Sequence, residues 1–293
     1  MILADNRASL VAVAARLRVS EPRLWTDRPV MDRAGRLVAL PGSGGVTLGI
    51  HAGDRVRQRI ADHAIPGISL EDLPGTGGAH GLICVGNRVR RLDGKTVGAV
   101  AGKRGGLAPG FLQGQYIGVE ASDDVLHGMA PGEEVVVESY GRGLALTDYS
   151  QLTITNCSPA TLDALPIQVI DGALAVGVRA EFPSVWTGPG LGTDVWIGDL
   201  ELAVPAEAQP NDLCYGDVVA FGNIDGQVNR FHREGYVAVG VVSHGPSPVA
   251  GHGTGVTILL SGPDTVLRTV RDAAASLAPF LRDTPRDSWR YIW

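Results

Sequence analysis

Glycine and proline interrupt this sequence at short intervals along its whole length. The 293 residues include 40 glycines and 18 prolines, whereas aromatic residues make up only 5%. Glycine permits tight turns and proline removes a backbone donor, so long helices are disfavoured. Between the breaks, short runs rich in β-branched residues are typical of strands. The pattern predicts a β-rich mixed fold of the α+β class, with barrel-like or sandwich-like strands, in one compact domain over residues 1–293.

Two segments carry apolar residues at helical spacing. Residues 8–17 place leucine, valine and alanine close to one helical face, and residues 264–282 place apolar residues opposite arginines and aspartates. We therefore predict amphipathic helices at both ends of the chain. A short helix is also predicted from Pro159, because Ser158 suits the N-cap and proline suits the first helical position.

The composition excludes several classes of protein. Hydrophobic residues make up 44%, charged residues 19%, and the net charge is −6. No apolar run approaches the roughly 20 residues that cross a bilayer, no long basic run occurs, and the first residues lack a secretory pattern. Three widely spaced cysteines suit reduced thiols better than a disulfide framework. We expect a cytoplasmic protein that binds neither membrane nor nucleic acid.

Two histidines lie in a glycine-flanked segment between two predicted strands. Residues 236–242 and 256–260 are rich in β-branched residues, which places His244 and His252 at strand ends. Glycine on each side of His252 lets a ligand or a second backbone approach closely, and a neutral imidazole can ligate a metal or move a proton. The alternative is a pair of loop histidines bonded to backbone, because two histidines alone do not define a metal site.

Asp62 and His63 stand next to each other before a Pro-Gly turn. Adjacent strand residues face opposite ways, so both can serve one site only if the backbone turns between them. Asp62 would then orient an imidazole. Asp62, His63, His244 and His252 are the candidate catalytic residues, and the three histidines are also candidate metal ligands. An exposed turn pair is the alternative.

The segment Gly102-Lys-Arg-Gly-Gly106 packs two cations between glycines. Lys103 and Arg104 in this setting suit a carboxylate or phosphate, and a solvated basic turn is the alternative. Asp194 and Asp199 are candidates for an additional carboxylate ligand. No phosphate-binding loop, dinucleotide fingerprint, Gly-x-Ser-x-Gly elbow or His-Glu-x-x-His helix occurs, so no nucleotide cofactor is expected.

Several separated motifs follow one another in a specific order. They are Ala61-Asp-His-Ala-Ile-Pro-Gly-Ile-Ser69, Gly86-Asn87, Gly102-Lys-Arg-Gly-Gly106, Gly141-Arg-Gly-Leu-Ala-Leu-Thr-Asp-Tyr149, Gly216-Asp-Val-Val-Ala220, Gly240-Val-Val-Ser-His244 and Gly251-His-Gly-Thr-Gly-Val-Thr257. Together they resemble the family called domain of unknown function 4438, over about residues 41–261. The family name implies no reaction.

Two positions depart from the pattern of that family. The resemblance implies a histidine where this chain has Arg104, and a second acid where it has Trp196. Arginine cannot replace histidine as a metal ligand because its guanidinium stays protonated, but it can bind an anionic substrate. An indole beside a cation suits an organic substrate. Lys103, Arg104, Trp196 and Asp194 are therefore candidate substrate-binding residues.

Together, these residues favour a small-molecule enzyme. The first hypothesis is hydrolysis or ring closure at an amide or lactam-type carbonyl of a carboxylate-bearing substrate, by histidine acid/base catalysis or with a divalent metal. The second is a non-hydrolytic cyclase or isomerase of a specialised biosynthetic pathway, and the third is a small-ligand-binding protein without turnover. A homo-oligomer is also expected.

Overall fold

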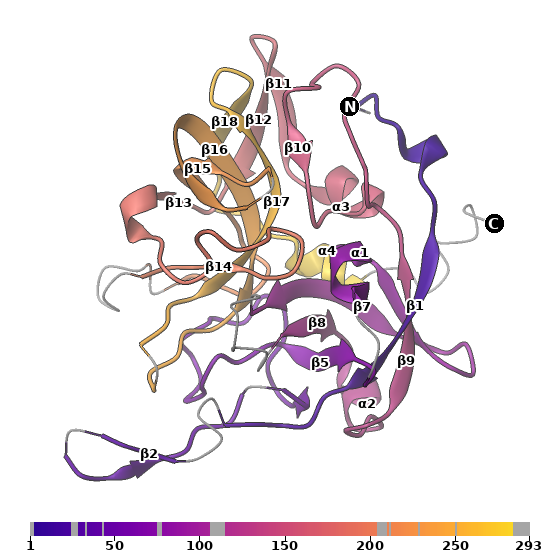
Figure 1. Ribbon diagram of the computed structural model, residues 1–293, viewed down its shortest axis with the longest axis vertical. Helices are drawn as coiled ribbons and strands as arrows, with labels where there is room; N and C mark the ends of the chain where they lie inside the picture. The colour runs from indigo at the N-terminus through magenta and orange to yellow at the C-terminus, as the bar shows by residue number, and fades with distance from the viewer. Residues whose placement is uncertain are drawn as a thin grey trace.

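The computed structural model describes residues 3–24, 29–32, 34–42, 44–74, 78–105, 115–203, 210, 212–227, 229–249 and 251–283. Strands predominate over short helices in these residues (Figure 1). The prediction of a β-rich fold is therefore confirmed. Cys84, Cys157 and Cys214 are free thiols, as expected. No described helix is long and apolar enough to cross a membrane.

Six antiparallel strands close into a barrel. In order around the ring they are β1 (Val13–Val19), β9 (Glu134–Ser139), β6 (Arg88–Arg91), β7 (Thr96–Arg104), β8 (Tyr116–Glu120) and β5 (Gly67–Asp72). The ring closes because β5 pairs with both β8 and β1, and β4 (Val46–Thr47) also pairs with β5. Fully buried apolar side chains such as Leu17, Val89 and Ile117 pack together in this part of the fold. Closure removes the free edges of an open sheet.

A second sheet of six strands packs against the barrel. Its order is β10 (Thr153–Ile154), β17 (Gly255–Pro263), β16 (Phe231–His244), β15 (Val218–Asp225) and β13 (Ala180–Pro183), with β14 (Leu200–Glu201) also paired to β17. Barrel strand β7 contacts both β16 and β17, and the amide of Lys103 donates to Thr257 Oγ1 at 2.8 Å. In Figure 1 the barrel lies at the lower right and the second sheet at the upper left.

Smaller elements complete the fold. They are the sheet of β11 (Ile167–Ile170), β12 (Ala173–Val178) and β18 (Leu267–Arg271), the hairpin of β2 (Val30–Met31) and β3 (Leu37–Val38), the helices α1 (Ala79–Leu82), α2 (Asp123–Leu126), α3 (Pro159–Ala164) and α4 (Ala278–Asp283), and the 3-10 turns η1 (Arg7–Ser9) and η2 (Ser184–Trp186). Helix α3 begins at Pro159 as predicted, and Ser158 caps it by accepting from the amide of Thr161.

Both predicted terminal helices are wrong. Residues 8–17 enter β1, where Ala15, Leu17 and Val19 are buried and alternate with arginines, so a period of two overrides the apparent helical face. Within residues 264–282, Leu267–Arg271 form β18, which pairs in parallel with β12, and the segment becomes helical only from Ala278, where α4 begins. Pairing with a neighbouring strand outweighed local helical spacing in both segments.

One apolar cluster joins the barrel to the rest of the fold. It includes Ala99 and Ala101 of β7, Val176 of β12 and Val239 of β16. The barrel and the second sheet are therefore in direct contact through buried side chains. That residues 1–293 form a single compact domain stays a prediction.

Candidate functional site

Three histidines meet where the barrel contacts the second sheet. His244 ends β16, His252 lies in the loop to β17, and His63 lies in the loop before β5. The His63 ring centroid is 5.5 Å from that of His244 and 5.3 Å from that of His252. The structure thus brings the three candidate catalytic histidines into one cluster.

The backbone turns at His63, which places Asp62 in the same cluster. His63 has a positive φ of 52°, a conformation that a residue with a side chain rarely adopts. The turn lets Asp62 Oδ2 lie 3.4 Å from His63 Nδ1, while Ser247 Oγ donates to the other oxygen of Asp62. Burial would raise the pKa of Asp62, but bonds from His63 and Ser247 and the charge of Arg104 hold it below its usual value. Asp62 therefore orients His63.

His63, His252 and Glu201 present three ligand-type atoms to one another. His63 Nε2 lies 3.4 Å from His252 Nδ1, and His252 Nδ1 lies 3.4 Å from Glu201 Oε2. Glu201 Oε2 is buried and has no hydrogen-bond partner among the described residues. Burial, together with the charges of Arg104 and His244, lowers the pKa of His63 to about 3 against the opposing effect of Asp62. His63 is therefore neutral near pH 7 and can offer a lone pair.

His244 and Asp199 form a buried ion pair behind these three residues. His244 Nε2 donates to Asp199 Oδ2 at 2.7 Å, and His244 Nδ1 donates to the carbonyl of Gly245 at 2.7 Å. Burial opposes a charged imidazole, but Asp199 and Glu201 raise the pKa of His244. Each ring nitrogen of His244 has a hydrogen-bond acceptor, so both nitrogens carry a hydrogen and the ring is an imidazolium. His244 Nε2 also lies 3.8 Å from Glu201 Oε1, so the positive charge of His244 stabilises the negative charge of Glu201.

Arg104 and Lys103 point to opposite faces of β7, as neighbours on a strand do. Arg104 is 2% exposed, and its charge interacts with Asp199 and Glu201. Lys103 instead donates to the backbone carbonyls of His80 and Trp196, and its complete burial lowers its pKa to about 7. Only Arg104 joins the histidine cluster.

The other two candidate substrate-binding residues lie on the Lys103 side. The guanidinium of Arg142 stacks 3.3 Å from the centre of the Trp196 ring. Asp194 is exposed, accepts from the amide of Trp196 at 2.8 Å, and interacts electrostatically with Lys103. Trp196 and Asp194 are thus grouped around Lys103 and not around the histidines.

A cavity of about 740 Å³ opens beside His252. Its described lining consists of Val56, Arg57, Arg59, Ile60, Ala61, Ala64, Ala203, Gly245, Pro246, Ser247, Pro248, Gly251, His252 and Gly253. The His252 side chain is 28% exposed, whereas that of His63 is fully buried. A ligand in this cavity would therefore reach the histidine cluster through His252.

Sequence reasoning missed Glu201. The signal was present, because Asp199 and Glu201 are two residues apart and so project from the same face of an extended segment. It was hidden because β14 has only two residues, Leu200 and Glu201, and therefore no periodicity.

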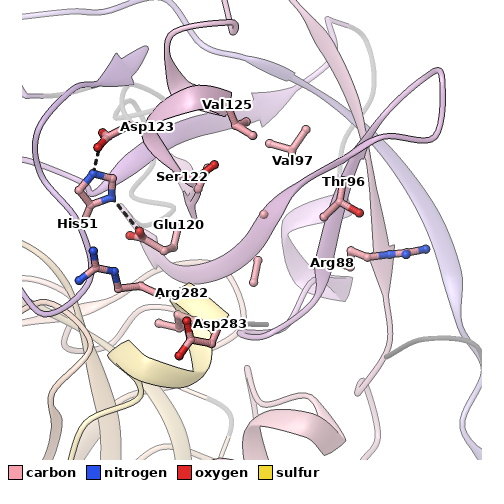
Figure 2. Close-up of a pocket in the computed structure, with 14 residues that line it drawn as sticks. His51, Arg88, Thr96, Val97, Glu120, Ser122, Asp123, Val125, Arg282 and Asp283 are labelled. Atoms are coloured by element: carbon pink, nitrogen blue, oxygen red, sulfur yellow. Dashed lines mark hydrogen bonds and ion pairs between the residues drawn. The ribbon is translucent and has the colours of Figure 1, made fainter. Parts of the chain in front are cut away.

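A second, smaller cavity of about 330 Å³ lies at the barrel beside α4 (Figure 2). Figure 2 shows His51 between two carboxylates: its Nδ1 is 2.9 Å from Glu120 Oε1 and its Nε2 is 3.0 Å from Asp123 Oδ1. Burial opposes protonation, but the two carboxylates raise the pKa of His51. This contact fastens the loop after β4 to the barrel, and His63 lies further along the same loop.

Fold and site together define a β-barrel protein with a second sheet and a buried histidine–carboxylate cluster between them. The model of the N-terminal part of the domain of unknown function DUF4438 matches residues 30–163, and the model of its C-terminal part matches residues 164–281. The chain therefore belongs to the DUF4438 family, as its motifs predicted.

A solved structure shares the fold. The crystal structure of TM1086 is similar to this chain with a TM-score of 0.85 and 26% sequence identity, over 95% of this chain and 99% of that chain. No curated protein matches this chain.

Proposed function

We propose that this chain is a small-molecule enzyme in which a divalent metal, held by His63, His252 and Glu201, activates a carbonyl group. The observation that carries the proposal is Glu201 Oε2, a buried carboxylate oxygen without a hydrogen-bond donor, 3.4 Å from His252 Nδ1. An unsatisfied buried carboxylate is costly, and a cation bound beside it would remove that cost.

The spacing of the three side chains suits a tetrahedral metal. Histidine and carboxylate ligands bind zinc at about 2.0–2.1 Å, which puts neighbouring tetrahedral ligand atoms roughly 3.3–3.4 Å apart. The two separations at His252 Nδ1, to His63 Nε2 and to Glu201 Oε2, are both 3.4 Å. One imidazole pair and one carboxylate leave a fourth position for water or substrate, as catalytic zinc sites require.

The surrounding groups support this ligand set. Asp62 accepts from His63 Nδ1, which leaves Nε2 with the lone pair, and this carboxylate–histidine arrangement is frequent at metal sites. Two of the three carboxyl groups of the cluster already have close partners: Asp62 accepts from His63 and Ser247, and Asp199 faces His244 and the charge of Arg230. Glu201 Oε2 is the carboxylate oxygen of the cluster without a hydrogen bond from the described residues, so it would be the oxygen that binds a divalent cation.

Hydrolysis at an amide or lactam-type carbonyl is the reaction we infer. A bound divalent metal would polarise the carbonyl and lower the pKa of a water molecule. Water is the only co-reactant: its hydroxyl joins the carbonyl carbon, the C–N bond breaks, and its proton joins the leaving nitrogen. The apolar cavity at His252 would hold the organic part of the substrate. Ring closure is the same reaction in reverse.

Metal analysis of purified protein tests the proposal. We expect one equivalent of a transition metal, and zinc titration of chelator-treated protein should show binding at least about tenfold weaker in Glu201→Gln. Glu234→Gln is the matched control, because Glu234 is exposed on β16 and away from the cluster. If the native protein binds no metal, or if Glu201→Gln binds it as tightly, the metal site does not exist. Carbonyl cleavage by metal-free protein would instead assign His252 to acid/base catalysis.

The chain is also proposed to form a homo-oligomer. The β2–β3 hairpin projects from the body of the molecule at the lower left of Figure 1, and it exposes 67% of Met31 and 72% of Leu37. A two-stranded hairpin is marginally stable on its own, and a second copy of the chain would cover these side chains.

A further inference from the structure

We infer that the cavity beside His252 binds a small organic anion with an apolar body, and that Arg59 and Arg57 hold its anionic group. The assignment of the reacting end of this ligand to His252 rests on the proposed function. The assignment of its charge rests on the lining of the cavity alone.

The charged residues in the described lining of the cavity are both arginines. Arg57 and Arg59 are the cations among the described lining residues, and none of these residues is acidic. This is unusual in a chain whose net charge is −6. Two guanidinium groups at the wall of a largely apolar cavity attract anions and repel cations. The charge of the preferred ligand is therefore negative.

The rest of the lining is apolar. Valine, isoleucine, alanine and proline side chains line the cavity together with glycine backbone, and Ser247 already donates to Asp62. The volume of about 740 Å³ lies within the range of small-molecule sites, roughly 300–1,000 Å³. A ligand that fills it buries mostly hydrocarbon and has few polar groups to satisfy besides its charge.

Arg59 has donors to spare for a carboxylate. It is exposed, and its bond to the carbonyl of Gly49 is at the long limit of 3.5 Å. A guanidinium carries several N–H donors in a planar fork that matches a carboxylate or a phosphate. Arg57 lies two residues earlier in the same loop and lines the same cavity. The side chains of Arg57 and Arg59 would bind the anionic end of the ligand, and His252 would contact its other end.

Anion binding is therefore assigned to the loop before β5 and not to Lys103 and Arg104 of β7, where the sequence predicted it. Lys103 donates to two backbone carbonyls on the opposite face of β7, and Arg104 is 2% exposed beside Asp199 and Glu201. Neither residue lines the cavity. The loop that carries His63 also supplies Arg57 and Arg59, so one segment would position a metal ligand and the charge of the substrate.

Calorimetric binding of two matched probes tests the inference. Naphthylacetate carries one negative charge, and naphthylethanol is a neutral compound of similar size that the proposed reaction cannot cleave. We expect the native protein to bind the acid at least about tenfold more tightly than the alcohol, and Arg59→Gln with Arg57→Gln to abolish that preference. Binding of naphthylethanol should not change. Arg268→Gln with Arg271→Gln is the control, because both arginines are exposed on β18 and this pair of substitutions removes the same two charges elsewhere.

A carboxylate could also bind the proposed metal, and Glu201→Gln separates the two sources of affinity. The inference requires Glu201→Gln to keep the preference for the acid. It is overturned if the preference survives in the arginine variants, if it disappears in Glu201→Gln alone, or if the native protein binds both probes equally or neither. The binding assay needs no turnover, so it can show charge-selective binding even if the protein binds no metal. Metal binding without a preference for the acid would overturn the inference and leave the metal proposal standing.

Discussion

Replacement of Gly255 by alanine should break the buried ion pair of His244 and Asp199. A Cβ atom at Gly255 would lie 2.0 Å from His244 Nε2 and 2.4 Å from Asp199 Oδ2. Both separations are far inside van der Waals contact, so a side chain must move. His244 has no room to retreat, because it is fully buried and also bonded to the carbonyl of Gly245.

The cost follows from the pair that is lost. Breaking a buried ion pair so that one charge stays unpaired costs about 3–5 kcal/mol. For a chain of this size each kcal/mol corresponds to about 2–4 °C, so Gly255→Ala should lower the melting temperature by roughly 6–20 °C. Burial would then act on His244 without its partner, so its pKa should fall from the raised value of the native protein.

Calorimetry and NMR of the histidine side chains measure these two effects. Gly222→Ala is the matched control, because Gly222 lies in β15 of the same sheet and a Cβ there meets no atom within 4 Å. The control should melt within about 2 °C of the native protein. If Gly255→Ala melts like the control and keeps a raised His244 pKa, the pair is not held against β17 as described, and the support assigned to Glu201 fails with it.

Two further predictions concern the loop after β4 and the projecting hairpin. The carboxylates of Glu120 and Asp123 raise the pKa of His51 above 6.5, so its stabilising charge is complete below that pH and is lost as pH rises through the raised value. A melting-temperature profile against pH should therefore be flatter over that window for His51→Gln than for the native protein. The control His232→Gln, at an exposed position on β16, should retain the native slope. Light scattering should show an oligomer for the native chain and a smaller species for Leu37→Asp; a native monomer would remove the role proposed for Met31 and Leu37.

The strand–loop–strand unit that carries two of the histidines was predictable because every signal in it is local. Its β-branched runs became β16 and β17, and its glycines became the loop. The glycine at position 253 allows a close backbone approach, since a Cβ there would lie 1.5 Å from the carbonyl oxygen of Leu202. That approach brings β14, and with it Glu201, to the histidines. The pairing of so short a strand leaves no pattern in the sequence, which is why the carboxylate was missed.

The terminal segments failed for a related reason. In residues 8–17 the apolar residues Val13, Ala15 and Leu17 fit the alternation of a strand as well as a helical face, and in residues 264–282 the strand β18 buries only Leu267, so its own pattern does not separate helix from strand. The choice between them depends on a partner strand, which for β1 is β9 and for β18 is β12, each more than 80 residues away in the sequence. Local periodicity does not contain that information.

Arg104 shows how a departure from a family pattern acquires a physical meaning once its surroundings are known. In the sequence it stood where the resemblance implies a histidine, and it weakened the metal hypothesis. In the structure its guanidinium lies among the carboxylates of the cluster and helps to lower the pKa of His63. It cannot act as a ligand, but it favours the neutral imidazole that a ligand must have. The arginine at this position therefore leaves His63 able to act as a ligand, and in the proposed metal site Glu201, whose Oε1 lies 3.8 Å from His244 Nε2, would supply the third ligand.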